Sequence, residues 1–402
     1  MTYRILSLDG GGTWSVLQVM ALIDLYGADR PGTQVLEQFH MVAATASGSL
    51  VLGGLLANLR LDEIKALFVD PKQRGALLRS SGWFNTARYN TRRKHKAIEK
   101  FLGDVGEWSL DKIKKRSEGA DFKPLEVLIT AYDYDDGHPV VFRSSLPDGR
   151  YQHPSTVVTP EITLSEAIHA STTPPIRYFD RPARVDSLQR RYWGGAVSGY
   201  NNPAVIAVQD ALARGVPREK IAVLSLGTGT VLPDLSKPLN YKKTKRGVSQ
   251  PLHDEGVLLN ALLDNPRPQS CFLAENLIAP GNIVRLNPLL ALRPDGQGGW
   301  VRPGSLDINQ FQYLRELQLD AHDPVAVQAI TGFGRLWLEG AVRNEPVLLD
   351  EGSQACLIGH DDIRDAKASW DEVRKGRPAL QVRPVKKLGL FARINRWVDN
   401  NA

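Results

Sequence analysis

The sequence has few of the features that mark several common protein classes. Only two cysteines occur in 402 residues, Cys271 and Cys356, and neither belongs to a metal-binding or redox motif. This excludes a disulfide framework, and we expect two thiols in a reducing compartment. The longest apolar run, Leu50–Leu59, is far shorter than the roughly 20 residues that cross a bilayer. Because no charged-then-apolar leader opens the chain, we expect a cytoplasmic protein.

The charge balance argues against a nucleic-acid partner. A net charge of +6 is modest for this length, and no aromatic-interleaved basic motif or long basic arm occurs. Metal ligands are equally sparse. The acidic turn with Asp133, Asp135 and Asp136 is followed by no glutamate that would complete a calcium loop. We therefore expect no metal, no cofactor and no nucleic acid, and the sequence does not indicate an oligomeric state.

What the chain does have is a dense cluster of small residues at 39–54, FHMVAATASGSLVLGG. Met41–Ala44 predict a short strand, the next residues a sharp turn, and the apolar pattern from Leu50 a helix. Strand, turn and helix form the setting of a nucleophile elbow, whose G-x-S-x-G motif presents a serine hydroxyl. The five elbow positions here are Ala44, Thr45, Ala46, Ser47 and Gly48. The nucleophile position holds Ala46, which has no hydroxyl.

A glycine triplet follows the first predicted strand. Tyr3–Leu8 has the pattern of a strand and Val16–Tyr26 that of an amphipathic helix, and between them stand Gly10, Gly11 and Gly12. Backbone N–H groups at a helix N-terminus suit an anion or a developing oxyanion. A glycine triplet is also consistent with a plain turn. Two functional interpretations are open: the oxyanion hole of an acyl hydrolase, or a phosphate loop of an actin-like sugar kinase, with Leu226–Thr230 as the second such loop. A kinase loop needs another strand next, and the helical spacing favours the hydrolase.

A second cluster of small residues, RYWGGAVSGYNNP, occupies 191–203. Its glycines permit a tight loop, and Pro203 suits the first position of a helix. Further on, Ile221–Leu226 is the continuous apolar run of a buried parallel strand. Thr163–Ser171 predicts a helix, and we interpret His169 within it as a structural residue rather than a member of a catalytic triad.

These elements predict an α/β fold with three layers, in which a mostly parallel central sheet carries helices on both faces. We expect one domain over residues 1–345 and a C-terminal extension over 346–402. The basic stretch 72–100 and the basic amphipathic tail from Arg374 each have two interpretations. The stretch 72–100 is either a solvated surface or a basic rim that meets lipid headgroups or an acidic partner. The tail either packs on its own domain or lies on a membrane. Peripheral membrane contact is therefore an expectation that the sequence leaves open.

Three clusters, LSLDGGGTW at 6–14, AATASGS at 43–49 and YWGGAVSGYNNP at 192–203, stand in an order and spacing that resemble the patatin-like phospholipases. SEAIHASTTPPIRYFD and LSLGTGT also resemble segments of that family, and the resemblance covers about residues 3–345. It implies a lipid acyl hydrolase of the phospholipase A or lysophospholipase type. The implied substrate is a phospholipid or another acyl-ester lipid, and the implied machinery is a serine–aspartate dyad without histidine.

The resemblance also implies roles for individual positions. The oxyanion loop is Gly10, Gly11 and Gly12, the elbow is Ala44–Gly48, and the dyad loop is Gly194, Gly195 and Ala196. The serine position then holds Ala46 and the aspartate position holds Gly194. Since no acyl-enzyme forms without a nucleophile, we expect this chain to be catalytically inactive.

Three explanations for the missing dyad are open. The chain is a deliberately disabled hydrolase, a natural pseudoenzyme that binds lipid or protein, or an enzyme with a shifted nucleophile at Ser47 or Ser49. Retention of the surrounding glycines favours the first explanation. Geometry disfavours the third, because Ser47 would be the first helical residue and would point away from the apex of the turn.

Overall fold

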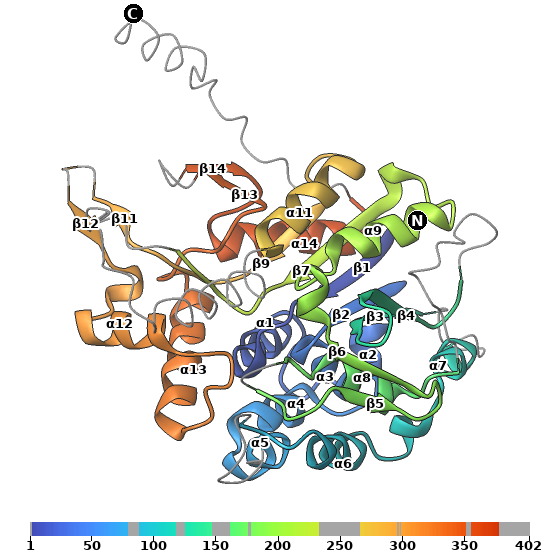
Figure 1. Ribbon diagram of the computed structural model, residues 1–402. Coiled ribbons are helices and arrows are strands. Elements are labelled where there is room, and N and C mark those ends of the chain that lie inside the picture. The colour runs from blue at the N-terminus through green and yellow to red at the C-terminus, as the bar shows by residue number, and fades with distance from the viewer. Residues whose placement is uncertain are drawn as a thin grey trace, which may run out of the picture.

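The apolar runs of the sequence become the strands of one central sheet (Figure 1). A computed structural model describes residues 2–78, 88–117, 125–146, 161–175, 178–232, 266–295, 297, 299–350 and 355–377. The eight-stranded sheet has the order β5-β6-β3-β2-β1-β7-β9, and β4 pairs with β3 outside this path. Its strands are β1 (Tyr3–Leu8), β2 (Met41–Thr45), β3 (Glu126–Asp133), β4 (His138–Arg143), β5 (Ala183–Val185), β6 (Arg190–Gly194), β7 (Ile221–Leu226) and β9 (Ile283–Leu286).

Smaller strand pairs stand apart from this sheet. They are β8 (Thr230–Val231) with β10 (Leu289–Leu290), β11 (Arg293–Pro294) with β12 (Trp300–Val301), and β13 (Leu348–Asp350) with β14 (Ala355–Ile358). The described helices are α1 (Val16–Tyr26), α2 (Gly32–Leu36), α3 (Ser47–Leu56), α4 (Leu61–Val69), α5 (Pro71–Leu77), α6 (Thr91–Leu102), α7 (Leu110–Ser117), α8 (Leu164–Ser171), α9 (Ala204–Ala213), α11 (Pro266–Leu277), α12 (Ile308–Glu316), α13 (Pro324–Leu338) and α14 (Ile363–Arg374). Short 3-10 turns are η1 (Gly12–Ser15), η2 (Gly103–Glu107), η3 (Gly195–Ser198), η4 (Arg218–Lys220) and η5 (Pro303–Ser305).

Both faces of the central strands are buried. Leu6 and Leu8 belong to a large apolar core that includes side chains of α1, α3, α4, α8 and α13, whereas Ile5 belongs to a second core with α9 and α11. Successive strand residues point to opposite faces, which explains why these strands are continuous apolar runs. Strands β3, β2, β1, β7 and β9 pair in parallel. The predicted α/β fold, a mostly parallel sheet with helices on both faces, is confirmed (Figure 1).

The register of the sheet brings three loops to one edge. Leu8 of β1 pairs with Ala44 of the parallel strand β2, so the segments that follow these strands leave the sheet side by side. Thr45 pairs with Thr130 of β3. Gly194, the last residue of β6, pairs with Ala131, which follows Thr130 in β3. The carboxyl edge of parallel strands is where open α/β sheets place their ligand sites.

Most of the predicted elements are observed at the predicted places. η1 and α1 follow the glycine triplet, so helix stands where a sugar-kinase loop would need a second strand. The basic tail beyond residue 377 lies outside the described residues, and the domain boundary at 345 stays a prediction. Within the described ranges, none of the helices combines the length and the apolar character that a membrane span requires.

Candidate active site

A sharp turn joins β2 to α3 at Ala46. Its φ of 47° and ψ of −124° lie in a region that residues with side chains rarely adopt. The Ala46 N–H donates to Ser171 Oγ at 2.8 Å, and the Ser49 hydroxyl donates to the Ala46 carbonyl. A glycine at 48 permits the close approach to β1, because a Cβ on Gly48 would lie 2.6 Å from the Leu8 carbonyl oxygen. The surrounding structure therefore fixes a strained apex whose side chain is a methyl group.

The glycine loop after β1 lies against this elbow. The Gly11 N–H donates to the Ser47 hydroxyl at 3.0 Å, and the Gly10 N–H donates to the Asn201 carbonyl at 2.9 Å. A Cβ added to Gly10 would lie only 3.0 Å from the Cβ of Ala46. The backbone of the loop thus approaches the elbow more closely than a chain with side chains could.

The third loop begins at the end of β6. The Gly194 N–H donates to the Thr173 carbonyl at 2.7 Å. A Cβ on Gly194 would lie 3.0 Å from the Ser171 carbonyl oxygen, so an aspartate there fits once the backbone gives by a few tenths of an ångström. Gly195 leaves no such room, because a Cβ would lie 2.1 Å from Thr130 Oγ1. The segment 171–174 therefore contacts both the elbow and the residue at the aspartate position.

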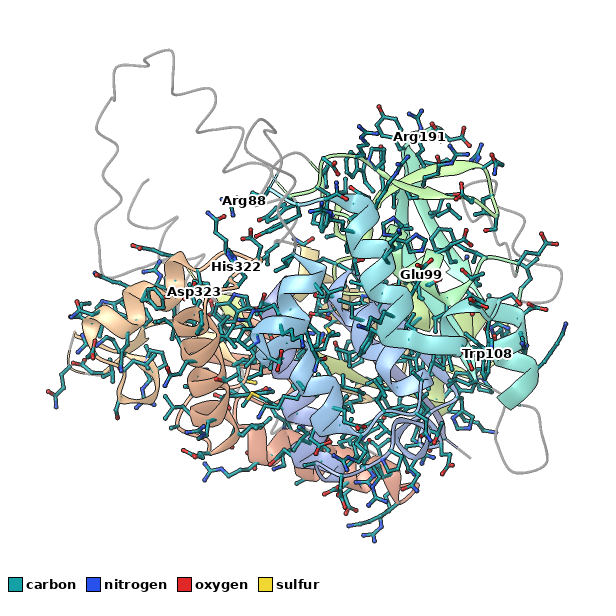
Figure 2. All side chains as sticks on the ribbon, turned by 90° about the horizontal axis from the view of Figure 1, so that it is seen from below. Arg88, Glu99, Trp108, Arg191, His322 and Asp323 are labelled. Carbon is teal, nitrogen blue, oxygen red and sulfur yellow. The ribbon has the colours of Figure 1, made fainter. Side chains whose placement is uncertain are left out.

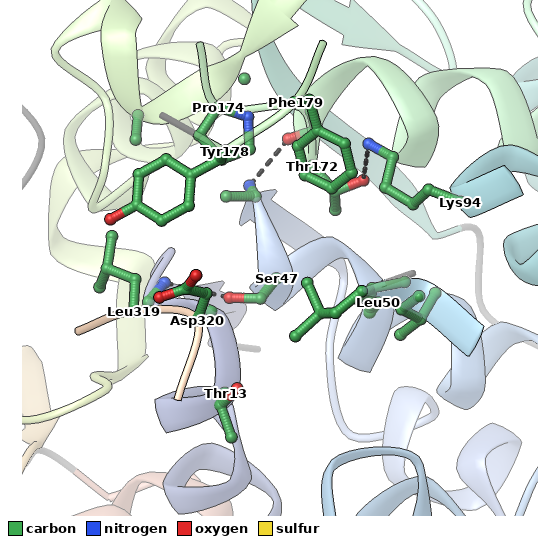
Figure 3. Close-up of a pocket in the computed structure, with 18 of the residues that line it drawn as sticks. Thr13, Ser47, Leu50, Lys94, Thr172, Pro174, Tyr178, Phe179, Leu319 and Asp320 are labelled. Atoms are coloured by element: carbon green, nitrogen blue, oxygen red, sulfur yellow. Dashed lines mark hydrogen bonds between the residues drawn. The ribbon is translucent and has the colours of Figure 1, made fainter. Parts of the chain in front are cut away.

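A cavity of about 120 Å³ brings the three loops together (Figure 3). Its lining contains predicted site positions from all three sequence clusters: Gly11 and Gly12, Ala46 and Ser47, Gly194 and Ala196. The other predicted positions lie outside the lining: Gly10, Ala44, Thr45, Gly48 and Gly195. These positions shape the strand end and the tight turns that hold the lining residues in place.

Most of the cavity wall is apolar. The larger apolar side chains in the lining are Leu50, Leu67, Phe68, Leu77, Leu78, Ile98, Pro174, Phe179, Val197 and Leu319. Each methylene group that such a wall removes from water stabilises a bound ligand by about 0.8 kcal/mol. The wall therefore suits a hydrocarbon chain that reaches toward Ala46.

A buried lysine, Lys94, lines the same cavity and is only 3% exposed. Its Nζ donates to the His169 carbonyl at 2.9 Å and to the Thr172 and Thr173 hydroxyls at 3.0 and 2.5 Å. The same atom lies 4.5 Å from the centre of the Phe179 ring. Burial lowers the pKa of Lys94 well below its usual value. Lys94 thus ties α6 to the segment that contacts both Ala46 and Gly194.

The interpretation of 72–100 as a solvated surface or a membrane rim is wrong for Arg74 and Lys94. Both are buried, and Arg74 donates to three backbone carbonyls around it. Helix α6 buries Thr91, Lys94 and Ile98 at helical spacing. That spacing is the signal by which the sequence could have revealed the buried lysine. Residues 79–87 of this stretch lie outside the described residues.

A carboxylate, Asp320, lines the cavity on the side away from Lys94 (Figure 3). Its Oδ2 accepts hydrogen bonds from the Tyr89 hydroxyl and from Arg88 Nη1, both at 2.7 Å. Burial and the nearby Asp320 raise the pKa of Tyr89, so the phenol keeps its proton. Figure 2 shows Arg88 beside the segment that carries His322. No local pattern in the sequence marks Asp320, Tyr89 and Arg88 as a group, so their contact was not predictable.

His169 lies outside the cavity lining and stacks on His95, with the ring centres 4.2 Å apart. This placement agrees with its interpretation as a structural residue. Among the described residues, no group of three or more His, Cys, Asp or Glu side chains is placed to hold a metal ion. The cavity lining offers backbone N–H groups, hydroxyls, the charged side chains of Arg74, Lys94 and Asp320, and an apolar wall.

Comparison with known proteins shows which family the chain is similar to. The family model of the patatin-like phospholipases matches residues 6–208, about half of the chain. The chain is 25% identical over 243 residues to the cGAMP-activated phospholipase of Pseudomonas aeruginosa, covering 57% of this chain and 63% of that protein. It is 28% identical over 249 residues to the probable inactive patatin-like protein 9 of Arabidopsis thaliana, covering 56% of this chain and 60% of that protein. The chain thus spans less than two thirds of the length of these relatives.

Two solved structures are also similar. VipD from Legionella pneumophila has a TM-score of 0.34 and 11% identity, covering 99% of this chain and 79% of that one. The type III effector protein ExoU has a TM-score of 0.27 and 10% identity, covering 83% of this chain and 53% of that one.

Proposed function

Because the chain belongs to the patatin-like phospholipase family, we propose that its cavity binds the acyl chain of an ester lipid. The frame is that of a phospholipase A or lysophospholipase, and this chain lacks both side chains of the dyad. The observation that carries the proposal is the position of Ala46. This residue stands at a strained turn and shares one cavity with Gly11, Gly12 and Gly194. Strain at a residue with a side chain persists mainly at functional sites.

The chemistry of the proposal follows from what remains in the cavity. A methyl group at Ala46 cannot attack an ester, and Gly194 has no carboxylate to accept a proton. We assign the oxyanion position to the backbone N–H groups of Gly11 and Gly12, which line the cavity beside the elbow. The apolar wall binds the acyl chain, and the ester is not turned over.

The names of the relatives support both halves of the proposal. One relative is a phospholipase and the other is named as probably inactive. A hydrolytic frame and a non-catalytic use of that frame therefore both occur among proteins similar to this one.

The test is reversal of both substitutions. We expect the A46S/G194D variant to hydrolyse p-nitrophenyl esters and phospholipid. Either change alone should stay nearly silent, because the nucleophile and its proton acceptor act as a unit. The A46S/G194N variant is the matched control, since it fills position 194 equally but offers no carboxylate. Esters from butyrate to palmitate then report the preferred chain length.

A folded A46S/G194D variant without esterase activity on any chain length would contradict the hydrolase frame. In that case, a fluorescent acyl lipid is titrated into the unmodified chain to test whether the cavity binds lipid without hydrolysing it. Binding that is lost when Leu50→Trp fills the cavity supports a lipid-binding module. Absence of binding rejects the proposed cavity function altogether.

A further inference from the structure

The first residue of α3 places a hydroxyl on the glycine loop. Ser47 Oγ accepts the Gly11 N–H at 3.0 Å and lies 2.6 Å from Ser15 Oγ. Ser47 is 6% exposed and Ser15 is fully buried. Figure 3 shows Ser47 on the wall of the cavity, and Gly11 also belongs to the lining. A backbone donor of the glycine loop is therefore already bound by the protein's own side chain.

The cations in and beside the cavity are also bound to the protein itself. The three protons of Lys94 Nζ have three oxygen acceptors, and Arg74 donates to three backbone carbonyls. Arg88 pairs with Asp320 at 2.7 Å. A carboxylate that pairs with one of these cations must displace an existing interaction, whereas an uncharged end group need not.

We propose that the Ser47 hydroxyl is an internal occupant of the anion position. It holds the Gly11 N–H that a fatty-acid carboxylate or an acyl oxyanion would use, and it thereby restricts the cavity to uncharged acyl ligands. This inference rests on the proposed acyl-binding function and adds to it a ligand class and a third block on hydrolysis. This block is independent of Ala46 and Gly194, because it removes a hydrogen-bond donor, the Gly11 N–H, rather than the nucleophile or the proton acceptor.

The physical basis is competition for one donor. A buried N–H that loses its acceptor is costly to leave unpaired, and its hydrogen bond to a charged acceptor is stronger than its bond to a hydroxyl. Removal of the Ser47 hydroxyl should therefore favour an anion at this place. An uncharged ligand that fills only the apolar wall should be indifferent to the change.

Calorimetric titration of the full chain with decanoate and with 1-decanol tests the inference. We expect the unmodified chain to bind 1-decanol at least about tenfold more tightly than decanoate. Ser47→Ala should tighten decanoate binding by about tenfold and leave 1-decanol binding unchanged. The matched control is Ser369→Ala, which removes a buried hydroxyl of α14 outside the cavity lining. Thermal melts confirm that each variant is folded.

Equal affinities for the two probes in the unmodified chain would overturn the inference. So would a Ser47→Ala variant that leaves their ratio unchanged. If neither probe binds the folded chain, the proposed acyl cavity itself is wrong and the inference falls with it. The two kinds of failure are therefore distinguishable.

Turnover provides a second readout. In the A46S/G194D background, Ser47→Ala should raise kcat by about a hundredfold, which is the usual effect of one oxyanion donor. Ser47→Thr keeps a hydroxyl and should not raise it. Equal kcat for the double variant and its Ser47→Ala derivative would reject the block on hydrolysis while leaving the proposed function intact. If neither the A46S/G194D variant nor its Ser47→Ala derivative hydrolyses an ester although 1-decanol binds, the hydrolase frame is wrong. The titrations with decanoate and 1-decanol then decide whether the cavity selects uncharged ligands.

Discussion

Arg285 and Asp9 form a buried ion pair beside the glycine loop. The Nη2 atom of Arg285 lies 2.7 Å from Oδ2 of Asp9, and the exposed fractions of the two side chains are 1% and 0%. Arg285 also contacts Glu345 at 3.3 Å and donates to Ser225 Oγ at 2.9 Å. Burial by itself would lower the pKa of Arg285, but the two carboxylates raise it above its usual value. The pair links the residue after β1 to β9 and so fixes where the glycine loop begins.

We predict that Arg285→Gln destabilises the fold by about 3–5 kcal/mol. Glutamine keeps part of the hydrogen bonding but removes the charge, so Asp9 and Glu345 are left buried without their shared cation. Equilibrium unfolding in urea measures the loss. The matched control is Arg364→Gln, the same chemical change in a pair with Asp362 where the arginine is 69% exposed. Exposed pairs contribute little, so this control should unfold like the unmodified chain. Equal behaviour of the two variants would contradict the assigned role of Arg285.

The stacked histidines predict a loss of stability in mild acid. Burial, together with Lys94 and His95, lowers the pKa of His169 well below its usual value. Below about pH 6.5 the unfolded chain therefore binds a proton that the folded chain refuses. The stability that the neutral histidines contribute is complete above that pH and is lost as the pH drops toward 5. Because burial also lowers the pKa of His95, His169→Gln should reduce this slope without abolishing it.

Melting temperatures of the unmodified chain and the His169→Gln variant, measured from pH 7.5 to 5, check this prediction. The quantity compared is the slope with pH, because any difference at pH 7.5 reports packing rather than protonation. If the melting temperatures of the two proteins changed equally with pH, His169 would bind its proton as readily in the folded protein as in the unfolded chain, and the prediction would be wrong.

The elements that local pattern determines were predictable. Ile221–Leu226 is apolar throughout because both faces of β7 are buried, and this pattern identifies a central strand. The turn at Ala46 was predictable because only small residues stand there and because Gly48 must approach β1. The resemblance to a family then selected Ala46 and Gly194, and the cavity brings these positions together. Their catalytic roles stay proposals.

Contacts that depend on which surfaces meet were not predictable. Lys94 stands in a basic stretch and became buried because α6 packs against α8 through that face. Arg285 interrupts an apolar strand, a sign of a buried charge, but its partners Asp9 and Glu345 are distant in sequence. The bond between Ser47 and Gly11 depends on two loops that meet only when β1 and β2 pair.

The neighbouring glycines Gly194 and Gly195 are constrained to different degrees, and alanine substitution should separate them. A Cβ on Gly195 would lie 2.1 Å from Thr130 Oγ1 and 2.4 Å from the Thr130 carbonyl oxygen, inside β3. We predict that Gly195→Ala costs about 1–3 kcal/mol, because a strand backbone cannot move aside. Gly194→Ala should cost clearly less, since its nearest contact, the Ser171 carbonyl oxygen, is at 3.0 Å.

Urea unfolding of the two alanine variants measures both costs under the same conditions. Each variant is the control for the other, because the residues are adjacent and the chemical change is identical. A loss at Gly194 as large as that at Gly195 would mean that the segment 171–174 cannot give way. An aspartate at position 194 would then strain the structure in the same way, since its Cβ meets the backbone carbonyl oxygen of Ser171 first, and hydrolase activity would return only if the backbone of 171–174 shifted.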